Sequence, residues 1–536
     1  MQPEMVFVGG TIRTLDHSTP VTDALAVSNG RVVALGHDAI EMRGTATHVV
    51  DLAGGVLLPS FGDGHAHPLL SGLGLRTVPV RGLRSVAEVV DAVRRWAEEH
   101  PQADWIVGDS FDPTIAPSGL FDSQWLDEAV PGRPVVLVTT DHHAMWVNSE
   151  ALRRAGITRD TPEPADGEIV RRPDGSPLGT LREWGALDFV SRLLPTPGLG
   201  EQIEALEEAT RLMASAGLTW AQDAWVAPDE VNAYLEAARQ GRLKARVNLA
   251  FRAEPEIWRN QLDQFRSDAA LVQSHEHDLV TARTIKFFSD GVIESGTAAL
   301  IEPYHDCPHS HGIANWTQED LSAAVTEVDR LGFQAHIHAI GDLGVRMGLD
   351  AVADCVRRNG PRDRRPTLAH VQLIDPDDLP RFAELGVVAC LQPLWAQPDA
   401  LMTKLTLPRI GSDRGSRQYQ IGSLVSSGAH VSFGSDWPVS SYEPLRGIAT
   451  AVARQRSDGE PPQGWLPQER VSVETALQAY SAGVAYQAFE EREWGTLVPG
   501  MRADLVHLAA DPFTLSAAEI AEVPVLGTWL GGIRTH

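Results

Sequence analysis

Two histidines, His65 and His67, lie two residues apart in the segment GDGHAHP, directly after a run of apolar residues. In a β-strand, residues i and i+2 point to the same side, so both imidazoles can face one site. Imidazole is a preferred ligand of zinc and of other divalent metals. The same spacing also occurs at the exposed ends of ordinary strands, so the meaning of this pair depends on its surroundings.

Four further residues with metal-binding or acid–base chemistry end other apolar segments of the chain: Lys286, His338, His370 and Asp436. Histidine and aspartate can bind a metal directly, whereas a lysine ammonium has no lone pair to offer. Lysine fits such a set as a carbamate formed with carbon dioxide, because the two carbamate oxygens can bridge two metal ions. The alternative is an unmodified lysine that pairs with a carboxylate such as Asp290.

Lysine is rare in this chain, so its occurrence at position 286 is informative. Only Lys244, Lys286 and Lys404 are lysines among the 45 basic residues, and the rest are arginines. GC-rich codon usage would explain the bias. A basic residue placed at random would therefore be lysine three times in 45, and arginine cannot form a carbamate. A lysine at this one position favours the functional interpretation over chance.

Eight apolar segments alternate with segments of helical periodicity and supply the framework for these residues. They span residues 56–67, 218–224, 245–251, 283–290, 333–340, 367–373, 387–393 and 430–436. Such alternation predicts an α/β fold with parallel strands covered by helices, and eight units close a TIM (β/α)8 barrel. The candidate residues lie at the carboxyl ends of these strands, where barrel enzymes place their active sites.

The remaining segments predict two additions to a barrel domain of residues 58–492. A gap of about 140 residues follows the first strand, which is too long for a loop. It contains a ninth apolar run, 134–143, so we predict that residues 70–210 form an inserted domain that caps the barrel mouth. Both chain ends carry short strand-like segments, which predicts a small β-sandwich built from residues 1–57 and 493–536.

The composition of this 536-residue chain limits the classes of partner that it can bind. Its formal net charge of −26 disfavours nucleic acids and anionic membrane surfaces. The three cysteines, Cys307, Cys355 and Cys390, are far apart and suggest no disulfide framework. The chain has no apolar run of membrane-spanning length, no basic leader followed by an apolar stretch, and no nucleotide-binding motif. We expect a cytoplasmic protein with a small-molecule substrate.

Several motifs together resemble the metal-dependent amidohydrolase superfamily, and more narrowly its YtcJ-like, amidohydrolase family 3 branch, which includes N-substituted formamide deformylases. They are LPSFGDGHAHP, TIKFFSDG, HIHAIGD, LAHVQ and FGSDWPV. The resemblance implies the barrel, the composite sandwich, and a site for one or two divalent ions, with Zn²⁺ expected. Its implied metal ligands are His65, His67, Lys286, His338, His370 and Asp436. Ser60 departs from the family, which usually has glycine there.

The expected activity is hydrolysis of a C–N amide-type bond in an N-substituted formamide, an N-acyl compound or a cyclic amide. The metal would activate a water molecule, and Asp436 would act as general base and then as general acid. A lactonase or esterase, a deaminase, and a metal-free non-catalytic homologue are the alternatives. Deaminases of this superfamily usually lack the bridging lysine, so Lys286 disfavours them. We also expect a homodimer.

Four further residues are predicted to contact substrate. His143 and Glu183 lie in the predicted insert and match the family's DGHxxWVNSxAL and GxLxE elements. His336 lies two residues before His338, and Trp437 follows Asp436. For each of the four, internal hydrogen bonding or plain packing is the alternative.

Overall fold

The computed structural model describes residues 2–164, 167–275 and 277–536. Its centre is a sheet of eight parallel strands that neighbour one another in chain order. They are β8 (Phe61–Ala66), β14 (Leu218–Val226), β15 (Arg246–Arg252), β16 (Val280–Phe288), β17 (Gln334–Ala339), β18 (Thr367–His370), β19 (Val388–Leu391) and β20 (His430–Phe433). The sheet curls so that the last strand approaches the first, which confirms the predicted TIM barrel.

Hydrogen bonds just beyond the carboxyl ends join β20 to β8. The amide of Asp436 donates to the carbonyl of His65 at 2.6 Å, and the amide of His67 donates to that of Trp437 at 2.8 Å. The buried carboxylate of Asp63 accepts from the amides of Ser435 at 2.9 Å and His65 at 3.2 Å. These bonds fix the first and last strands together at the end that carries the candidate ligands.

Helices pack around the barrel because each presents an apolar face to the strands. They are α7 (Leu199–Ser215), α8 (Val231–Arg239), α9 (Trp258–Ser274), α10 (Gln318–Arg330), α11 (Asp342–Asn359), α12 (Arg381–Leu385), α13 (Leu407–Gly415), α14 (Ile421–Ser426), α15 (Pro444–Ala453), α16 (Val473–Tyr480) and α17 (Ala482–Gln487). Most of their buried apolar side chains and those of the strands form one large core, while α17 and α13 contribute to two smaller clusters.

The first strand leads through α2 (Pro68–Gly74) into a separate five-stranded sheet with the order β12-β13-β11-β10-β9. Its strands are β9 (Ile106–Phe111), β10 (Val135–Thr139), β11 (Ala144–Val147), β12 (Glu168–Arg171) and β13 (Pro177–Arg182), with helices α3 (Val86–Glu99), α4 (Ser123–Asp127), α5 (Ser149–Ala155) and α6 (Trp184–Ser191). The ninth apolar run is therefore the strand β10 and the turn after it. Two apolar clusters of its own stabilise this unit.

The two chain ends share a sheet with the order β23-β22-β21-β7-β2-β3, and a second sheet has the order β5-β4-β1-β6. The strands are β1 (Met5–Val8), β2 (Thr11–Arg13), β3 (Val21–Thr22), β4 (Leu25–Ser28), β5 (Arg31–Leu35), β6 (His48–Asp51), β7 (Val56–Pro59), β21 (Leu505–Leu508), β22 (Val525–Leu530) and β23 (Ile533–Arg534), with helices α1 (Gly36–Glu41) and α18 (Ala517–Ala521). Phe7 and Trp529 pack edge to face, 5.0 Å apart, in the core between the two ends of the chain.

The predicted single strand 56–67 is wrong, because the chain changes sheets within it. The amide of Ser60 donates to the carbonyl of Asp504 in the terminal region, and the next amide, that of Phe61, donates to Gly217 beside the barrel. The apolar run is thus two strands, β7 and β8. At the change of sheet, the hydroxyl of Ser60 lies 2.6 Å from that of Thr219.

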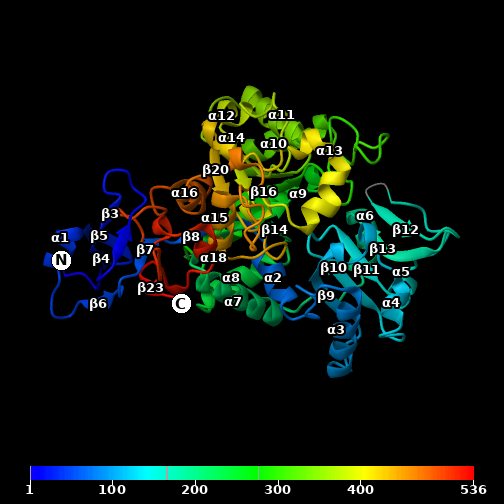
Figure 1. The fold of residues 1–536 in the computed structure, drawn as a ribbon, viewed down its shortest axis with the longest axis horizontal. Coiled ribbons are helices and arrows are strands. Elements are labelled where there is room, and N and C mark those ends of the chain that lie inside the picture. Colours follow the sequence, from blue (N-terminus) through cyan, green and yellow to red (C-terminus); the bar gives the residue numbers. More distant parts are fainter. Residues whose placement is uncertain (1, 165–166, 276) are drawn as a thin grey trace.

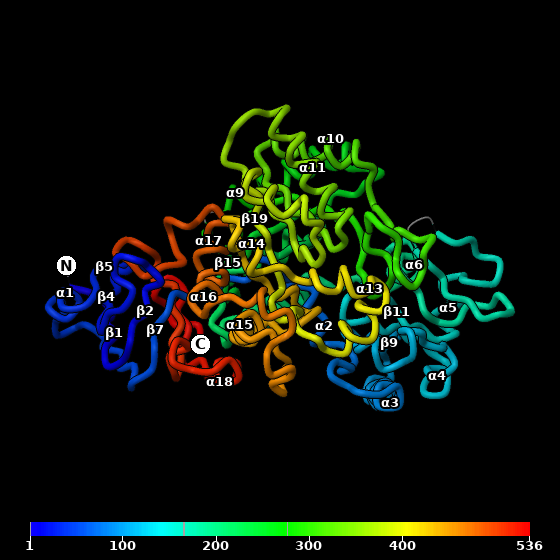
Figure 2. The backbone as a smooth tube through the Cα atoms, turned by 45° about the horizontal axis from the view of Figure 1, so that its top comes forward, coloured from blue at the N-terminus to red at the C-terminus, as the bar shows by residue number. Residues whose placement is uncertain are grey.

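The three units lie along the longest axis of the molecule (Figure 1). The sheets of the chain ends and the inserted unit occupy opposite ends, with the barrel between them, and a view turned by 45° shows the same order (Figure 2). Among the residues that the structure describes, no helix combines the length and the apolar composition needed to cross a membrane.

Candidate active site

A cavity of about 960 Å³ opens at the carboxyl ends of the barrel strands. All six predicted metal ligands line it: His65, His67, Lys286, His338, His370 and Asp436. The strand register explains why they meet, since Phe288 pairs with His338 and Ala339 pairs with His370. Neighbouring parallel strands therefore end at one level and present their last side chains to the same space.

His65, His67 and Asp436 form the tightest group in this cavity. One ligand atom from each lies within 4.8 Å of the others. Nε2 of His67 is 3.1 Å, and Nε2 of His65 is 3.4 Å, from Oδ1 of Asp436. Two imidazoles and a carboxylate converging at this range suit a divalent cation such as zinc.

Neighbouring groups determine which ring nitrogen of each histidine stays available. Nδ1 of His65 is 2.7 Å from Nε2 of His336, and Nδ1 of His370 is 2.9 Å from Oε1 of Gln392. Both rings thus retain Nε2 for a metal. Such partners fix the tautomer and the orientation of ligating histidines.

In His338 the other ring nitrogen is available. Its Nε2 lies 3.1 Å from the carbonyl oxygen of Gly291, which leaves Nδ1 for a metal.

Burial determines the charge of three of the candidate ligand histidines. It holds the pKa values of His65, His338 and His370 well below the ordinary histidine range, and the nearby Lys286 and histidine charges act in the same direction. The rings are therefore neutral, which is the form that binds metals.

Lys286 is buried, with its Nζ 3.3 Å from Nε2 of His65 and 4.7 Å from the ring centre of Phe288. Burial lowers the pKa of this ammonium to about 7, although Asp436 opposes the shift. A substantial fraction of the amine is therefore neutral near pH 7. Only the neutral amine can attack carbon dioxide.

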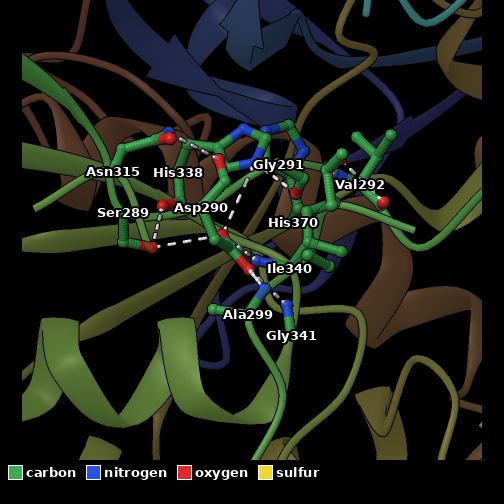
Figure 3. A network of polar contacts seen from close by, with 12 residues as sticks. Ser289, Asp290, Gly291, Val292, Ala299, Asn315, His338, Ile340, Gly341 and His370 are labelled. Atoms are coloured by element: carbon green, nitrogen blue, oxygen red, sulfur yellow. Dashed lines mark hydrogen bonds and ion pairs between the residues drawn. The ribbon is translucent and has the colours of Figure 1, made fainter. Parts of the chain in front are cut away.

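Asp290 does not pair with Lys286, because its carboxylate is bound elsewhere, and whether Lys286 is modified stays a prediction. Its carboxylate accepts hydrogen bonds from the amides of Gly341 at 2.8 Å and of Ile340 and Ala299 at 3.0 Å. Figure 3 shows this carboxylate between the loops that follow β16 and β17. Asp290 therefore anchors the segment that orients His338.

His143 reaches the cavity from the inserted unit, and its ring centre lies 5.8 Å from that of His338. Its Nδ1 is 2.8 Å from Oε2 of Glu183, whose other oxygen accepts a hydrogen bond from the hydroxyl of Thr297. Burial alone would lower the pKa of His143, but the Glu183 carboxylate more than offsets this and raises it to about 9. His143 is thus a cation at neutral pH.

The other three residues predicted to contact substrate do not line the cavity. Glu183 lies behind His143, and His336 lies beneath His65 with its Nδ1 unpartnered among the described residues. Trp437 is buried with its ring 4.9 Å from that of Tyr442. A substrate contact by these residues stays a prediction.

Sequence reasoning missed several residues at the site. Gln392 directly follows the seventh strand and Asp223 lies within the second, three residues before its end, where polar residues in or beside apolar strands were a usable signal. Asp223 accepts a hydrogen bond from Tyr234, and its Oδ1 lies 3.9 Å from Nδ1 of His67. The aromatic wall of the cavity gave no such signal: Trp184, Trp225, Phe288, Trp395 and Tyr419.

The sequence is similar to those of several known proteins. A sequence profile of the amidohydrolase family matches residues 48–536. Protein LONG AFTER FAR-RED 3 of Arabidopsis thaliana is 31% identical over 99% of this chain and 91% of its own length. The putative amidohydrolase YtcJ of Bacillus subtilis is 28% identical over 98% of both chains. The N-substituted formamide deformylase of Arthrobacter pascens is 27% identical over 99% of this chain and 98% of its own.

A solved structure extends the similarity to three dimensions. An uncharacterized metal-dependent hydrolase from Pyrococcus furiosus superposes with a TM-score of 0.72 at 25% identity, over 95% of this chain and all of its own. The resemblance inferred from the motifs is thereby confirmed.

Proposed function

Because the chain belongs to the amidohydrolase family, we propose that it is a metal-dependent hydrolase of a C–N amide-type bond. The substrate would be an N-substituted formamide, an N-acyl amine or a cyclic amide. The observation that carries the proposal is the convergence of His65, His67 and Asp436 within 4.8 Å in a cavity that also contains Lys286. The similarity to an N-substituted formamide deformylase supports the choice of bond.

The donor set fits one or two divalent ions, with zinc as the expected metal. His65, His67 and Asp436 would hold one ion, and His338 and His370 would hold a second. Lys286 would bridge them after its neutral amine attacks carbon dioxide, which forms an N–C bond and releases one proton. When bound, such ions lower the pKa of a coordinated water and polarise a carbonyl.

Asp436 would accept a proton from the attacking water and deliver it to the leaving nitrogen. Its carboxylate oxygen Oδ1 lies 3.4 Å from Nε2 of His65 and 3.1 Å from Nε2 of His67. An aspartate in this position can act first as base and then as acid without moving far.

His143 would stabilise negative charge on the substrate carbonyl oxygen. Glu183 holds its Nδ1, so Nε2 is free to donate a hydrogen bond into the cavity. A fixed cationic donor in a site that excludes water is an effective stabiliser of an oxyanion. Thr297 completes the support of Glu183 from the barrel side.

The direct test is hydrolysis of N-substituted formamides, N-acetyl amines and cyclic amides by the zinc- or manganese-loaded protein, read as released amine and acid. We expect activity on at least one class. Asp436→Asn keeps the shape of the side chain but removes the basic carboxylate, so turnover should fall by about 10²–10⁴-fold. A metal-loaded protein that cleaves none of the three classes would overturn the proposal.

A further inference from the structure

Glu294 is a carboxylate on the cavity wall that neither metal binding nor proton transfer uses. It lies in the turn 293–296 that follows β16, and this turn is held by hydrogen bonds from Gly296 to Ile293 at 2.9 Å and from Thr297 to Val292 at 3.0 Å. The hydroxyl of Thr297, in the same turn, supports the Glu183–His143 pair. Glu294 is therefore attached to the same rigid segment that faces the candidate metal centre.

The groups that contact the Glu294 carboxylate are neutral. The hydroxyl of Thr406 donates to its Oε1, and the Gln372 amide also lies within bonding reach. Arg409 bonds the main-chain oxygen of Glu294 at 2.9 Å and directs another nitrogen toward Asp306 at 3.3 Å. Within the described part of the chain, no ion pair neutralises this carboxylate. Burial accordingly raises the pKa of Glu294 above its ordinary value.

Two arginines of the cavity wall already have carboxylate partners. Arg446 pairs with Glu443 at 2.9 Å and Arg456 with Asp458 at 2.8 Å. Asp399 accepts from the amide of Met402 at 2.9 Å and, like Glu294, has no ion pair among the described residues. Glu294 thus combines a negative charge, partial burial and the lack of a counterion, and it lies on the segment that also supports the Glu183–His143 pair.

The surroundings of Glu294 suit a cation. Tyr419 lies near enough for the Glu294 charge to contribute, after burial, to raising the pKa of its hydroxyl well above the ordinary range. Trp395 lines the same cavity and stacks on His370 with parallel rings 5.5 Å apart. Aromatic faces attract cations, and a partly buried carboxylate without a counterion gains Coulombic stabilisation when a cation binds.

We infer that Glu294 binds a positively charged group of the substrate, so that the preferred substrates are amides that also carry an ammonium or guanidinium group. The inference rests on the proposed amide hydrolysis and names its substrate class. The scissile amide would lie at the metals and the cationic group at Glu294. The spacing between the two groups would decide which amides are cleaved best.

The test compares N-acetyl-α,ω-diaminoalkanes of increasing chain length with N-alkylacetamides in which a methyl group replaces the terminal ammonium. For the wild-type protein, kcat/KM should be higher for the charged member of each pair and should peak at one length. Glu294→Gln should lower kcat/KM for the charged amides by about tenfold or more and leave the neutral amides nearly unchanged. Glu522→Gln, at the exposed rim of the same cavity, removes the same charge and should have little effect on either series.

A binding measurement separates failure of this inference from failure of the proposed function. Calorimetry of alkylamines, which are cations at neutral pH, against primary alcohols of equal length needs no turnover. Tighter binding of the amines that is lost in Glu294→Gln would support the cation site even if no amide were cleaved. Equal kcat/KM for charged and neutral amides, or equal binding of the amines and the alcohols, would overturn the inference while leaving amide hydrolysis intact.

Discussion

At the scale of single residues, the site shows how burial, with help from neighbouring charges, sets the protonation states of the candidate ligands. Burial keeps His65, His338 and His370 neutral and lowers the pKa of Lys286 to about 7. These are the protonation states that bind metals or react with carbon dioxide. His143 is the contrasting case, because its ion pair with Glu183 outweighs burial and keeps it charged.

Replacement of Lys286 tests whether its chemistry or its charge matters. A carbamate requires a primary amine, so Lys286→Arg should lose activity as completely as Lys286→Ala, by about 10²-fold or more. Short carboxylic acids should partly restore Lys286→Ala by supplying the bridging oxygens. Steady-state kinetics with and without acetate measure both effects. An active Lys286→Arg protein would show that the residue acts as a simple cation.

The His143–Glu183 pair predicts a pH dependence. Since the pKa of His143 is raised to about 9, the proton proposed to stabilise the oxyanion is present below that pH and is lost as the pH rises through 9. The value of kcat/KM should therefore fall on the basic side near pH 9. In Glu183→Gln, only Asp141 and Asp436 still oppose the effect of burial on the pKa of His143, so this fall should move to lower pH. If kcat/KM of Glu183→Gln fell at the same basic pH as that of the wild-type protein, a group other than His143 would be responsible.

At the scale of elements, the barrel strands were predictable and their junctions were not. Parallel strands are buried on both faces, so each is a short, nearly continuous apolar run. The same property hides the boundary at Ser60, because β7 and β8 are both fully buried and no polar residue apart from that serine separates them. The support that Gln392 and Asp290 give to the ligands depends on contacts between strands far apart in sequence, which spacing does not reveal.

Replacement of Asp290 tests whether this residue anchors the segment that orients His338. Asp290→Ala would leave the amides of Ala299, Ile340 and Gly341 without their acceptor. Because each unsatisfied buried amide costs about 1–3 kcal/mol, the free energy of unfolding should fall by about 3 kcal/mol or more. Urea unfolding followed by circular dichroism measures this. Asp377→Ala, at an exposed position, is the control. If Asp290→Ala lowered the free energy of unfolding no more than this control does, Asp290 would not anchor the segment.

At the scale of the whole molecule, three units contribute to one site. The barrel supplies the candidate ligands, while the inserted unit supplies His143 and residues 140–142 of the cavity wall. Helix α18, near the carboxyl terminus, contributes residues 517, 518 and 521 of the same wall. Sequence patterns predicted the barrel strands and strands at both chain ends, but only one apolar run, 134–143, in the inserted unit. They did not predict that α18 reaches the cavity, because that contact depends on how the units pack.

Removal of metal tests how far the fold depends on the site. The apolar cores do not involve the ligands, so a chelator should abolish hydrolysis while the far-ultraviolet circular dichroism stays unchanged. Because the metal would bind only the folded state, its removal should still lower Tm by several degrees. Added zinc should restore both activity and Tm. Full activity of the metal-free protein would exclude a catalytic metal.

Anomalous X-ray diffraction at the zinc edge, on crystals of the zinc-loaded protein, tests the central claim most directly. The account predicts one peak between His65, His67 and Asp436. It predicts a second peak beside His338 and His370, with extra density beyond Nζ of Lys286. Crystals of an active preparation with no anomalous peak at the first position would contradict the assignment of this cavity as a metal-dependent active site.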